Sequence, residues 1–315
     1  MSPAPLRLDE APLRAAHAAR ARAAAEALQH GAGHAPLALA KTTSNLFRHR
    51  ERTARQRIDL HALNQVIGID TAAGWVEAEG LTTYEDLVAF TLPRGVMPAV
   101  VPQLKTITVG GAVAGVGIEA TSFRHGLVHE TMSALEVLLP HGEIVRCTAD
   151  NEHADLFHGF PNAYGTLGYA LAVRLRTRPT RPFVHVQHHR FSDPRAFFDA
   201  MARECGNGAR TDAPDFVDGV LFGPHEQVLS VGRFVPAAAR TSDYTGLDIY
   251  HESLRRRADD TLTTAGYLWR WDTDWFWCSR RFGLQHRGLR RLLGGRYLKS
   301  RTYTRWMRWN ARWRA

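Results

Sequence analysis

Apolar and polar residues alternate in short runs from Pro36 onwards, which is the pattern of half-buried β-strands. The clearest run is Tyr169–Thr177. Three more strands are predicted at Arg57–Leu60, Val66–Ile69 and Trp75–Glu79. A hairpin is predicted where Ala134–Leu139 and Glu143–Cys147 flank a His141-Gly142 turn.

Helical patterns interrupt these runs. Ala11–Leu28 consists of strong helix formers and is followed by Gly31 and Gly33. Thr82-Thr-Tyr-Glu85 reads as a capping box that opens a helix through Leu92. Asn151 is the expected N-cap of a short helix to Phe157. From Phe183 on we expect helices and one strand-like piece, Val228–Phe234.

Charge is distributed unevenly along the 315 residues. The net charge is +9, but residues 280–315 hold twelve of the 40 Lys and Arg and none of the 31 Asp and Glu, so the rest carries −3. Any electrostatic partner therefore belongs to the tail. No apolar run is long enough to cross a membrane, and the start lacks the apolar core of a secretory signal. Cys147, Cys205 and Cys278 are far apart, which suits a reducing cytoplasm, so we expect a cytoplasmic, non-secreted protein.

A glycine-rich segment, Thr106–Gly126, carries the candidate chemistry. Its glycines leave backbone N–H groups unobstructed, and consecutive exposed N–H groups form a concave anion site suited to a diphosphate. Gly115-Val-Gly-Ile-Glu-Ala120 also fits the dinucleotide fingerprint, but no strand precedes it and His125 and Gly126 follow too soon for a long helix. We therefore reject a Rossmann interpretation, and the alternative is a buried turn without a ligand.

A second loop, Asn162–Gly168, lies about forty residues further on and immediately precedes the Tyr169–Thr177 strand. Its glycines at Gly165 and Gly168 permit the chain to turn sharply. We expect this loop to close over the ligand of the first.

Together these motifs resemble the vanillyl-alcohol-oxidase-like flavoproteins, whose FAD domain is called PCMH-type, and within them the delta-24 sterol reductase (diminuto/seladin) group. The resemblance runs from Pro36 to beyond Arg280. It is carried chiefly by these stretches: Thr108-Val-Gly-Gly111, Gly115-Val-Gly-Ile-Glu119, Ser122, His125-Gly-Leu127, Leu138 to Thr148, Asp155-Leu-Phe157 and Gly165-Thr-Leu-Gly168.

The resemblance implies an α+β fold: a two-subdomain PCMH-type FAD domain followed by an α+β cap (substrate) domain. We place an Ala-rich helix at 1–34, the FAD domain at 35–180 and a partial cap domain with a basic aromatic tail at 181–315. Members of the group continue past the point that matches Ala315, so we expect the chain to be truncated and the cap incomplete.

The same resemblance assigns FAD to the two loops. The residues expected to bind it are Thr108, Val109, Gly110, Gly111, Gly115, Gly117, Ile118, Glu119, Thr121, Ser122, Gly126, Gly165 and Gly168. Related proteins often tether the flavin through a histidine in an earlier glycine-rich loop. Here the matching stretch is Lys41-Thr-Thr-Ser-Asn45, without glycine or histidine, so noncovalent FAD is expected, with Lys41, Ser44 and Asn45 as polar contacts.

The implied activity is reduction of a C=C bond in a lipophilic, sterol-like substrate, with NADPH as the electron donor and FAD as the carrier. An FAD oxidase acting on an alcohol or sugar, and an inactive flavin-binding or membrane-associated fragment, are the alternatives. No catalytic acid is assigned. His185, His188 and His189 cluster without a nearby carboxylate or cysteine, so no metal site is predicted.

The tail at 296–314 places Trp306, Trp309 and Trp313 along one helical side beside a stripe of arginines. Three interpretations stay open, in order of preference. They are a cap helix whose partners lie outside this chain, peripheral contact with a membrane surface, and nucleic-acid binding, which we do not expect.

Overall fold

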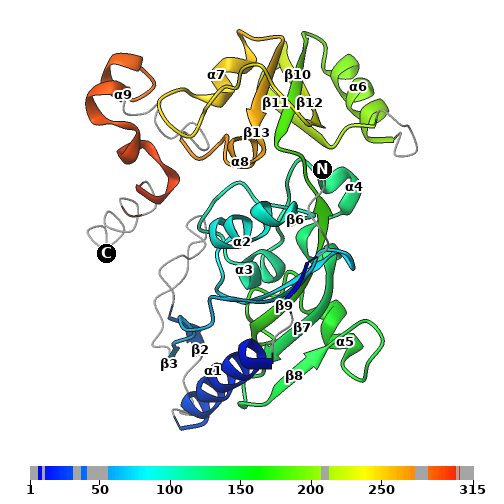
Figure 1. Ribbon diagram of the computed structural model, residues 1–315, viewed down its shortest axis with the longest axis vertical. Helices are drawn as coiled ribbons and strands as arrows, with labels where there is room; N and C mark the ends of the chain where they lie inside the picture. Colours follow the sequence, from blue (N-terminus) through cyan, green and yellow to red (C-terminus); the bar gives the residue numbers. More distant parts are fainter. Residues whose placement is uncertain are drawn as a thin grey trace. The chain divides into compact units, whose positions relative to one another are not determined.

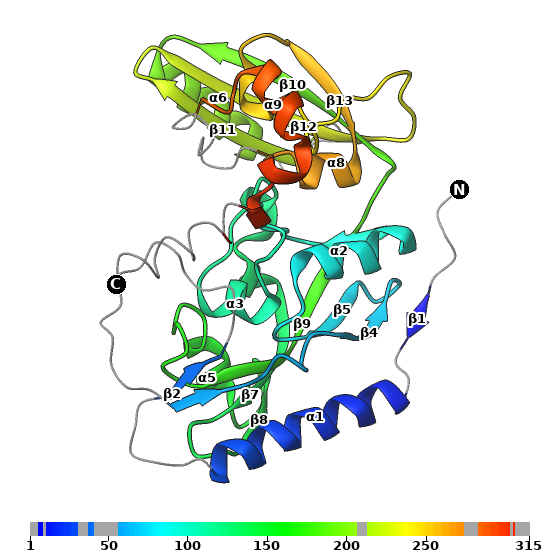
Figure 2. The same ribbon diagram turned by 90° about the vertical axis from the view of Figure 1, so that its left-hand side faces the viewer.

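The computed structural model describes residues 6–8, 11–30, 37–40, 56–206, 213–273, 283–302 and 305. The chain divides into two compact units (Figures 1 and 2). Unit 1 comprises 1–102, 106–118 and 127–179, and unit 2 comprises 103–105, 119–126 and 180–315. Both combine strands and helices, which confirms the α+β class.

Unit 1 is built on an antiparallel sheet in the order β1-β4-β5-β9-β7-β8, with β6 also paired to β9. Its strands are β1 (Arg7–Leu8), β4 (Val66–Asp70), β5 (Trp75–Glu79), β6 (Val96–Pro98), β7 (Met132–Leu138), β8 (Ile144–Cys147) and β9 (Tyr169–Pro179), and a separate parallel pair is β2 (Leu37–Leu39) with β3 (Gln56–Ile58). Its helices are α1 (Ala11–His30), α2 (Tyr84–Thr91), α3 (Val109–Ala114) and α5 (Ala154–Gly159), with 3-10 turns η1 (Leu92–Arg94) and η2 (Val128–Thr131).

The two faces of this sheet differ in chemistry. Side chains alternate along β5, so Val76 and Ala78 face α2 and α3, whereas Glu77 and Glu79 face α1. Figure 2 shows α1 on one side of the sheet and α2 and α3 on the other. The sheet therefore buries an apolar face under α2 and α3 and a charged one under α1.

Helix α1 is held by buried ion pairs as well as by apolar contact. His17 lies 2.9 Å from both Glu79 and Glu136, and Arg20 donates to Glu79. Burial alone would lower the pKa of His17, but the two carboxylates outweigh it and raise the pKa to about 9. The second half of the helix packs apolar residues, including Ala24 and Leu28, against the core.

Glu77 is the other buried anion of this face. It accepts hydrogen bonds from Arg14, Arg146 and Arg174. Burial alone would raise the pKa of Glu77, but Arg146 and Arg174 outweigh burial and lower it to about 2.

Unit 2 contains a four-stranded antiparallel sheet in the order β11-β12-β10-β13. Its strands are β10 (Phe183–Phe191), β11 (Phe216–Gly223), β12 (Glu226–Val235) and β13 (Asp259–Thr263). Its helices are α4 (Ser122–His125), α6 (Pro194–Gly206), α7 (Tyr250–Leu254), α8 (Thr264–Leu268) and α9 (Arg287–Leu293), followed by the 3-10 turn η4 (Gly295–Leu298). Phe197 and Ala200 of α6 pack on Val217, Leu229 and Val231.

Most predicted elements of unit 1 are confirmed, with two local corrections. The helix cap is Thr83, which accepts from the Asp86 N–H, and the predicted box at Thr82 and Glu85 is one residue too early. Helix α5 begins at Ala154, because Asn151 uses its side chain to accept from Thr148 and His153 rather than to cap the helix.

The prediction for the second half of the chain was too poor in strands. We expected one strand, and the described residues contain β10, β11 and β13 besides β12. The predicted contacts at Lys41, Ser44 and Asn45, and the tryptophans at 306, 309 and 313, lie outside the described residues.

Candidate functional site

The glycine-rich segment begins at the N-terminus of α3, which Thr108 caps. The Thr108 hydroxyl accepts from the Gly111 N–H at 3.3 Å, and the Val109 and Gly110 N–H groups donate to the carbonyls of Thr82 and Gly80, both at 2.9 Å. The Val109 and Gly110 amides thus hold α3 against the domain, and the Gly111 amide is satisfied by the cap. Gly110 is glycine for the same reason, since a Cβ there would lie 3.0 Å from the Gly80 oxygen.

The turn after α3 has different properties. Val116 has φ +62°, a left-handed conformation that a β-branched residue rarely adopts. Within the described ranges, the N–H groups of Val116, Gly117 and Ile118 make no hydrogen bond. Gly117 is confined, because a Cβ would lie 2.6 Å from Val128 Cγ2. Three successive amides of a strained turn are therefore left without a protein partner among the described residues.

The second loop lies directly against this turn. The Tyr164 N–H donates to the Ala114 carbonyl at 2.9 Å, and a Cβ on Gly115 would lie 3.6 Å from the Tyr164 ring. Asn162 and Tyr164 have φ values of +60° and +52°. Together with Val116 they are the non-glycine residues of the described chain with positive φ. The structure thus brings together the two loops that the sequence assigned to one ligand.

The glycines of the second loop are required by backbone geometry. Gly165 has φ +84° and Gly168 has φ +140°. A Cβ on Gly168 would lie 2.6 Å from the Leu138 oxygen, so this glycine lets the loop approach β7.

The two loops carry exposed apolar side chains. In the described part of unit 1, the large apolar residues that are exposed are Ile118 (65%), Tyr164 (37%) and Leu167 (41%). A soluble protein does not usually gather its uncovered apolar residues on a strained backbone unless a ligand covers them. These exposed apolar residues and the strained backbone make the two loops the candidate site of unit 1.

The remaining predicted site residues belong to unit 2. The Ser122 hydroxyl accepts from the Glu119 N–H at 3.1 Å, Thr121 is buried, and Gly126 has φ +75°. The Val217 N–H donates to the Ala120 carbonyl, which adds this stretch to the edge of unit 2.

Sequence reasoning missed the partner of Glu119. Arg270 has a side chain only 1% exposed and donates to Glu119 at 3.1 Å and to Asp218 at 2.9 Å. Its guanidinium also lies 4.0 Å from the centre of the Tyr267 ring. No local signal could have found this cluster, because its members are 151 and 52 residues from Arg270 in the chain.

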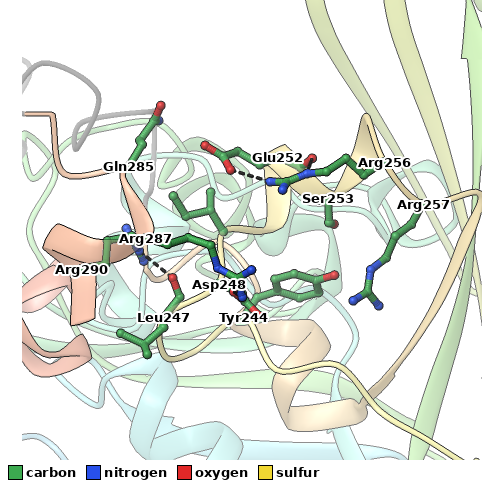
Figure 3. A pocket seen from close by; sticks show the side chains of 11 residues that line it. Tyr244, Leu247, Asp248, Glu252, Ser253, Arg256, Arg257, Gln285, Arg287 and Arg290 are labelled. Carbon is green, nitrogen blue, oxygen red and sulfur yellow. Dashed lines mark hydrogen bonds and ion pairs between the residues drawn. The ribbon is translucent and has the colours of Figure 1, made fainter.

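A cavity of about 180 Å³ lies elsewhere in unit 2 (Figure 3). Its lining includes Arg256, Arg257, Arg287 and Arg290, against two acids, Asp248 and Glu252. Arg256 pairs with Glu252 at 2.6 Å and Arg287 with Asp248 at 3.0 Å, so the acids fix the arginines in place. Arg257 pairs with Asp260 at 3.0 Å, and Arg290 donates to the Leu247 and Leu284 carbonyls, so all four arginines are engaged by protein groups.

Comparison with known proteins bears on the glycine-rich segment. Residues 15–148 match the family model described as FAD binding domain. The chain carries an FAD-binding domain. The match contains α3 and the strained turn and ends before the second loop.

Among curated proteins the chain is similar to sterol reductases. It is 30% identical over 189 residues to Delta(24)-sterol reductase of Arabidopsis thaliana, covering 58% of this chain and 33% of that protein. It is 32% identical over 170 residues to the human Delta(24)-sterol reductase, covering 54% of this chain and 32% of that protein. Cytokinin dehydrogenase 6 of rice is 29% identical over 148 residues, 47% of this chain and 28% of the relative.

The chain thus spans about a third of the length of the sterol reductases that it matches. Among the helices in the described ranges, none is both long and apolar enough to cross a membrane.

Proposed function

We propose that the chain is an FAD-dependent oxidoreductase that binds FAD noncovalently at the two loops of unit 1. The observation that carries this proposal is the coincidence of three unpaired amides, strained backbone and uncovered apolar side chains within one FAD-binding domain. We assign the diphosphate to the N–H groups of Val116, Gly117 and Ile118. Val109 and Gly110 position α3 through their bonds to the sheet.

When bound, FAD supplies hydride transfer. The residues of this chain bind and orient it: Gly165 and Gly168 shape the second loop, and Tyr164, Leu167 and Ile118 offer apolar cover. The noncovalent assignment follows from the absence of histidine and glycine in Lys41–Asn45.

The cofactor assignment can be tested on the purified protein. The folded protein is expected to show the visible absorption bands of oxidised flavin, and acid precipitation should release all of the yellow colour into the supernatant. A colourless protein that does not bind added FAD would refute the assignment, and colour that stays in the precipitate would show a covalent link.

For the reaction, we infer reduction of a C=C bond in a lipophilic, sterol-like substrate with NADPH as the electron donor. The support is the similarity to two Delta(24)-sterol reductases. The assay is bleaching of the flavin by NADPH without oxygen, followed by recovery of its colour on adding a 24-unsaturated sterol.

A second candidate is an FAD enzyme that oxidises an alcohol or a sugar-like substrate. The match to a cytokinin dehydrogenase favours it, because that relative is named for a dehydrogenase. In this alternative the substrate itself bleaches the flavin without NADPH. Oxygen is then consumed when air is admitted. Peripheral contact of residues 296–314 with a membrane remains a separate proposal, tested by sedimentation with anionic vesicles.

A further inference from the structure

The exposed apolar side chains of unit 2 are concentrated around α9. In the described part of this unit six large apolar side chains are exposed, and four of them belong to α9, to η4 and to the loop that α9 contacts. These four, which we call the α9 patch, are Leu247 (40%), Leu292 (82%), Leu293 (39%) and Tyr297 (61%). Leu292 is the most exposed large apolar side chain among the described residues.

Helix α9 is fixed to the unit by its polar side, which leaves its apolar side outward. Arg290 is buried and donates to the Leu247 carbonyl at 2.6 Å, and Arg287 pairs with Asp248 at 3.0 Å (Figure 3). Successive residues of an α-helix are about 100° apart, so Leu292 lies about 200° around α9 from Arg290. The side of the helix opposite its buried anchor is therefore apolar and exposed.

Positive charge borders the α9 patch. Residues 280–315 hold twelve Lys and Arg and no Asp or Glu. Arg291, which precedes Leu292, is exposed, and Lys299, which follows η4, is half-buried. The patch therefore combines uncovered apolar side chains with a stretch of chain that has no negative charge of its own.

These two properties together decide which kind of partner fits the patch. A second copy of the chain would bring one positive stretch against another, so charge opposes self-association there. A nucleic acid attracts the cations, but it binds side chains by base stacking and hydrogen bonding, to which exposed leucines contribute nothing. The surface of an anionic bilayer accepts both groups, because its phosphates attract the cations and its acyl boundary takes up the apolar side chains.

We propose that the α9 patch docks on the surface of a membrane that contains anionic lipids. Leu292 and Leu293 enter the boundary between headgroups and acyl chains, and Tyr297 lies at the level of the headgroups. The partner is the one proposed above for residues 296–314, but the inference depends on two leucines that precede that stretch. It requires neither bound flavin nor the proposed reaction.

The apolar part of the contact can be tested by sedimenting the full chain with vesicles of phosphatidylcholine and phosphatidylserine. The wild type should sediment with them, and Leu292→Ser combined with Leu293→Ser should weaken binding about tenfold or more, because apolar insertion is lost. The matched control is Leu221→Ser, which alters a leucine 56% exposed on β11 of the same unit and should bind like the wild type. A wild type that does not sediment, or a double variant that binds as tightly as the control, overturns the proposal.

The electrostatic part has its own pair of variants. Arg291→Gln removes a cation beside Leu292 and should weaken binding to the anionic vesicles about fivefold. Arg195→Gln makes the same change of charge at an exposed position of α6 and should have little effect. Equal weakening in the two variants would mean that only net charge matters, which overturns the assignment to the α9 patch.

Hydrogen exchange locates the contact without any substitution. When anionic vesicles are added to the wild type, amides of residues 287–298 should exchange more slowly, and amides of β10 and β12 should not change. Sedimentation with no slowing at residues 287–298 overturns the proposal.

Two results would assign the patch to another partner and overturn the proposal. One is binding of a single-stranded oligonucleotide by a wild type that does not bind vesicles. The other is a dimer in sedimentation velocity that the double leucine variant dissociates.

The tail and the flavin are distinguished from the α9 patch by the same vesicle assay. Vesicle binding that is lost in Trp306→Ser with Trp309→Ser, yet kept in the double leucine variant, assigns the contact to the tail and removes α9 from it. A colourless wild type that cannot bind FAD but still needs Leu292 and Leu293 for vesicle binding contradicts the proposed function and supports the docking.

Discussion

At the scale of single residues, the FAD-binding domain depends on a few side chains whose charge is set by burial. His17 is 6% exposed and sits between two carboxylates, which makes it a cation at neutral pH. An unpaired imidazolium could not persist there, and Glu79 and Glu136 would repel each other without it. Three charges from α1, β5 and β7 therefore stabilise one another.

His17 makes stability depend on pH in a defined window. Its folded pKa of about 9 exceeds the ordinary histidine pKa of 6.5, so its contribution to stability is complete below pH 6.5 and is lost as pH rises to about 9. A shift of this size corresponds to about 3 kcal/mol. The free energy of unfolding, measured in urea, should fall over that pH window in the wild type. In His17→Gln it should fall much less. Parallel pH profiles would contradict the assignment.

Gly117 offers a residue-scale test of the cofactor turn. A methyl group there would press on Val128 Cγ2 at 2.6 Å and on Pro102 Cγ at 3.2 Å, so Gly117→Ala must displace the turn. We expect a cost of about 1–3 kcal/mol in stability and a clear drop in the ratio of flavin to protein. Gly223→Ala is the control, because nothing lies within 4 Å of a Cβ there. Equal flavin content in the two variants would remove the turn from the site.

At the scale of elements, α1 is attached to the sheet by charge at one end and by apolar packing at the other. Glu77, 1% exposed, receives arginines from α1, β8 and β9. Glu77→Gln would leave three guanidinium groups around a neutral amide. We expect a loss of about 3–5 kcal/mol and faster amide hydrogen exchange along α1. Glu143→Gln, on an exposed side chain, should change neither quantity.

Local sequence patterns predicted the elements of unit 1 well, because their signals are complete within a few residues. Strand β5 matches its predicted bounds, and the β7–β8 hairpin follows from alternation around a Gly142 turn. Strand β10 was missed because His188 lies where an apolar residue would continue the period of Val184 and Val186. Strand β11 was missed because Asp218 and Gly219 interrupt its apolar run. The polar side chains in these two strands contact residues that are distant in the sequence, and a local pattern does not contain such contacts.

The candidate site was likewise predicted only where its signals are local in the sequence. Glycine spacing predicted both loops, and the structure places Tyr164 against Gly115. The left-handed backbone at Val116 could not be predicted, since valine disfavours it. The Arg270 cluster depends on the tertiary fold alone.

At the scale of the whole molecule, the two units are interleaved along the chain rather than consecutive. Residues 103–105 and 119–126 precede most of unit 2 by more than fifty positions but are built into it. Within unit 2, Glu119 bonds Arg270, Ala120 accepts from Val217, and Arg124 donates to the Pro214 carbonyl. The glycine-rich segment is therefore divided along the chain, with Thr108–Ile118 in unit 1 and Glu119–Gly126 in unit 2.

This interleaving predicts the outcome of a single cut between Pro179 and Thr180, the last point at which the chain passes from unit 1 to unit 2. With a protease site inserted there, the cleaved pieces should elute together in native buffer and separate only in denaturant. The reason is that the N-terminal piece carries Glu119–Gly126, and without it the C-terminal piece would leave Arg270, 1% exposed, without its Glu119 partner. Adding Arg270→Ala to the cleavable protein removes that buried charge pair and should let the pieces separate at lower denaturant. Separation of the unmutated pieces in native buffer would show that residues 180–315 hold together without Glu119–Gly126.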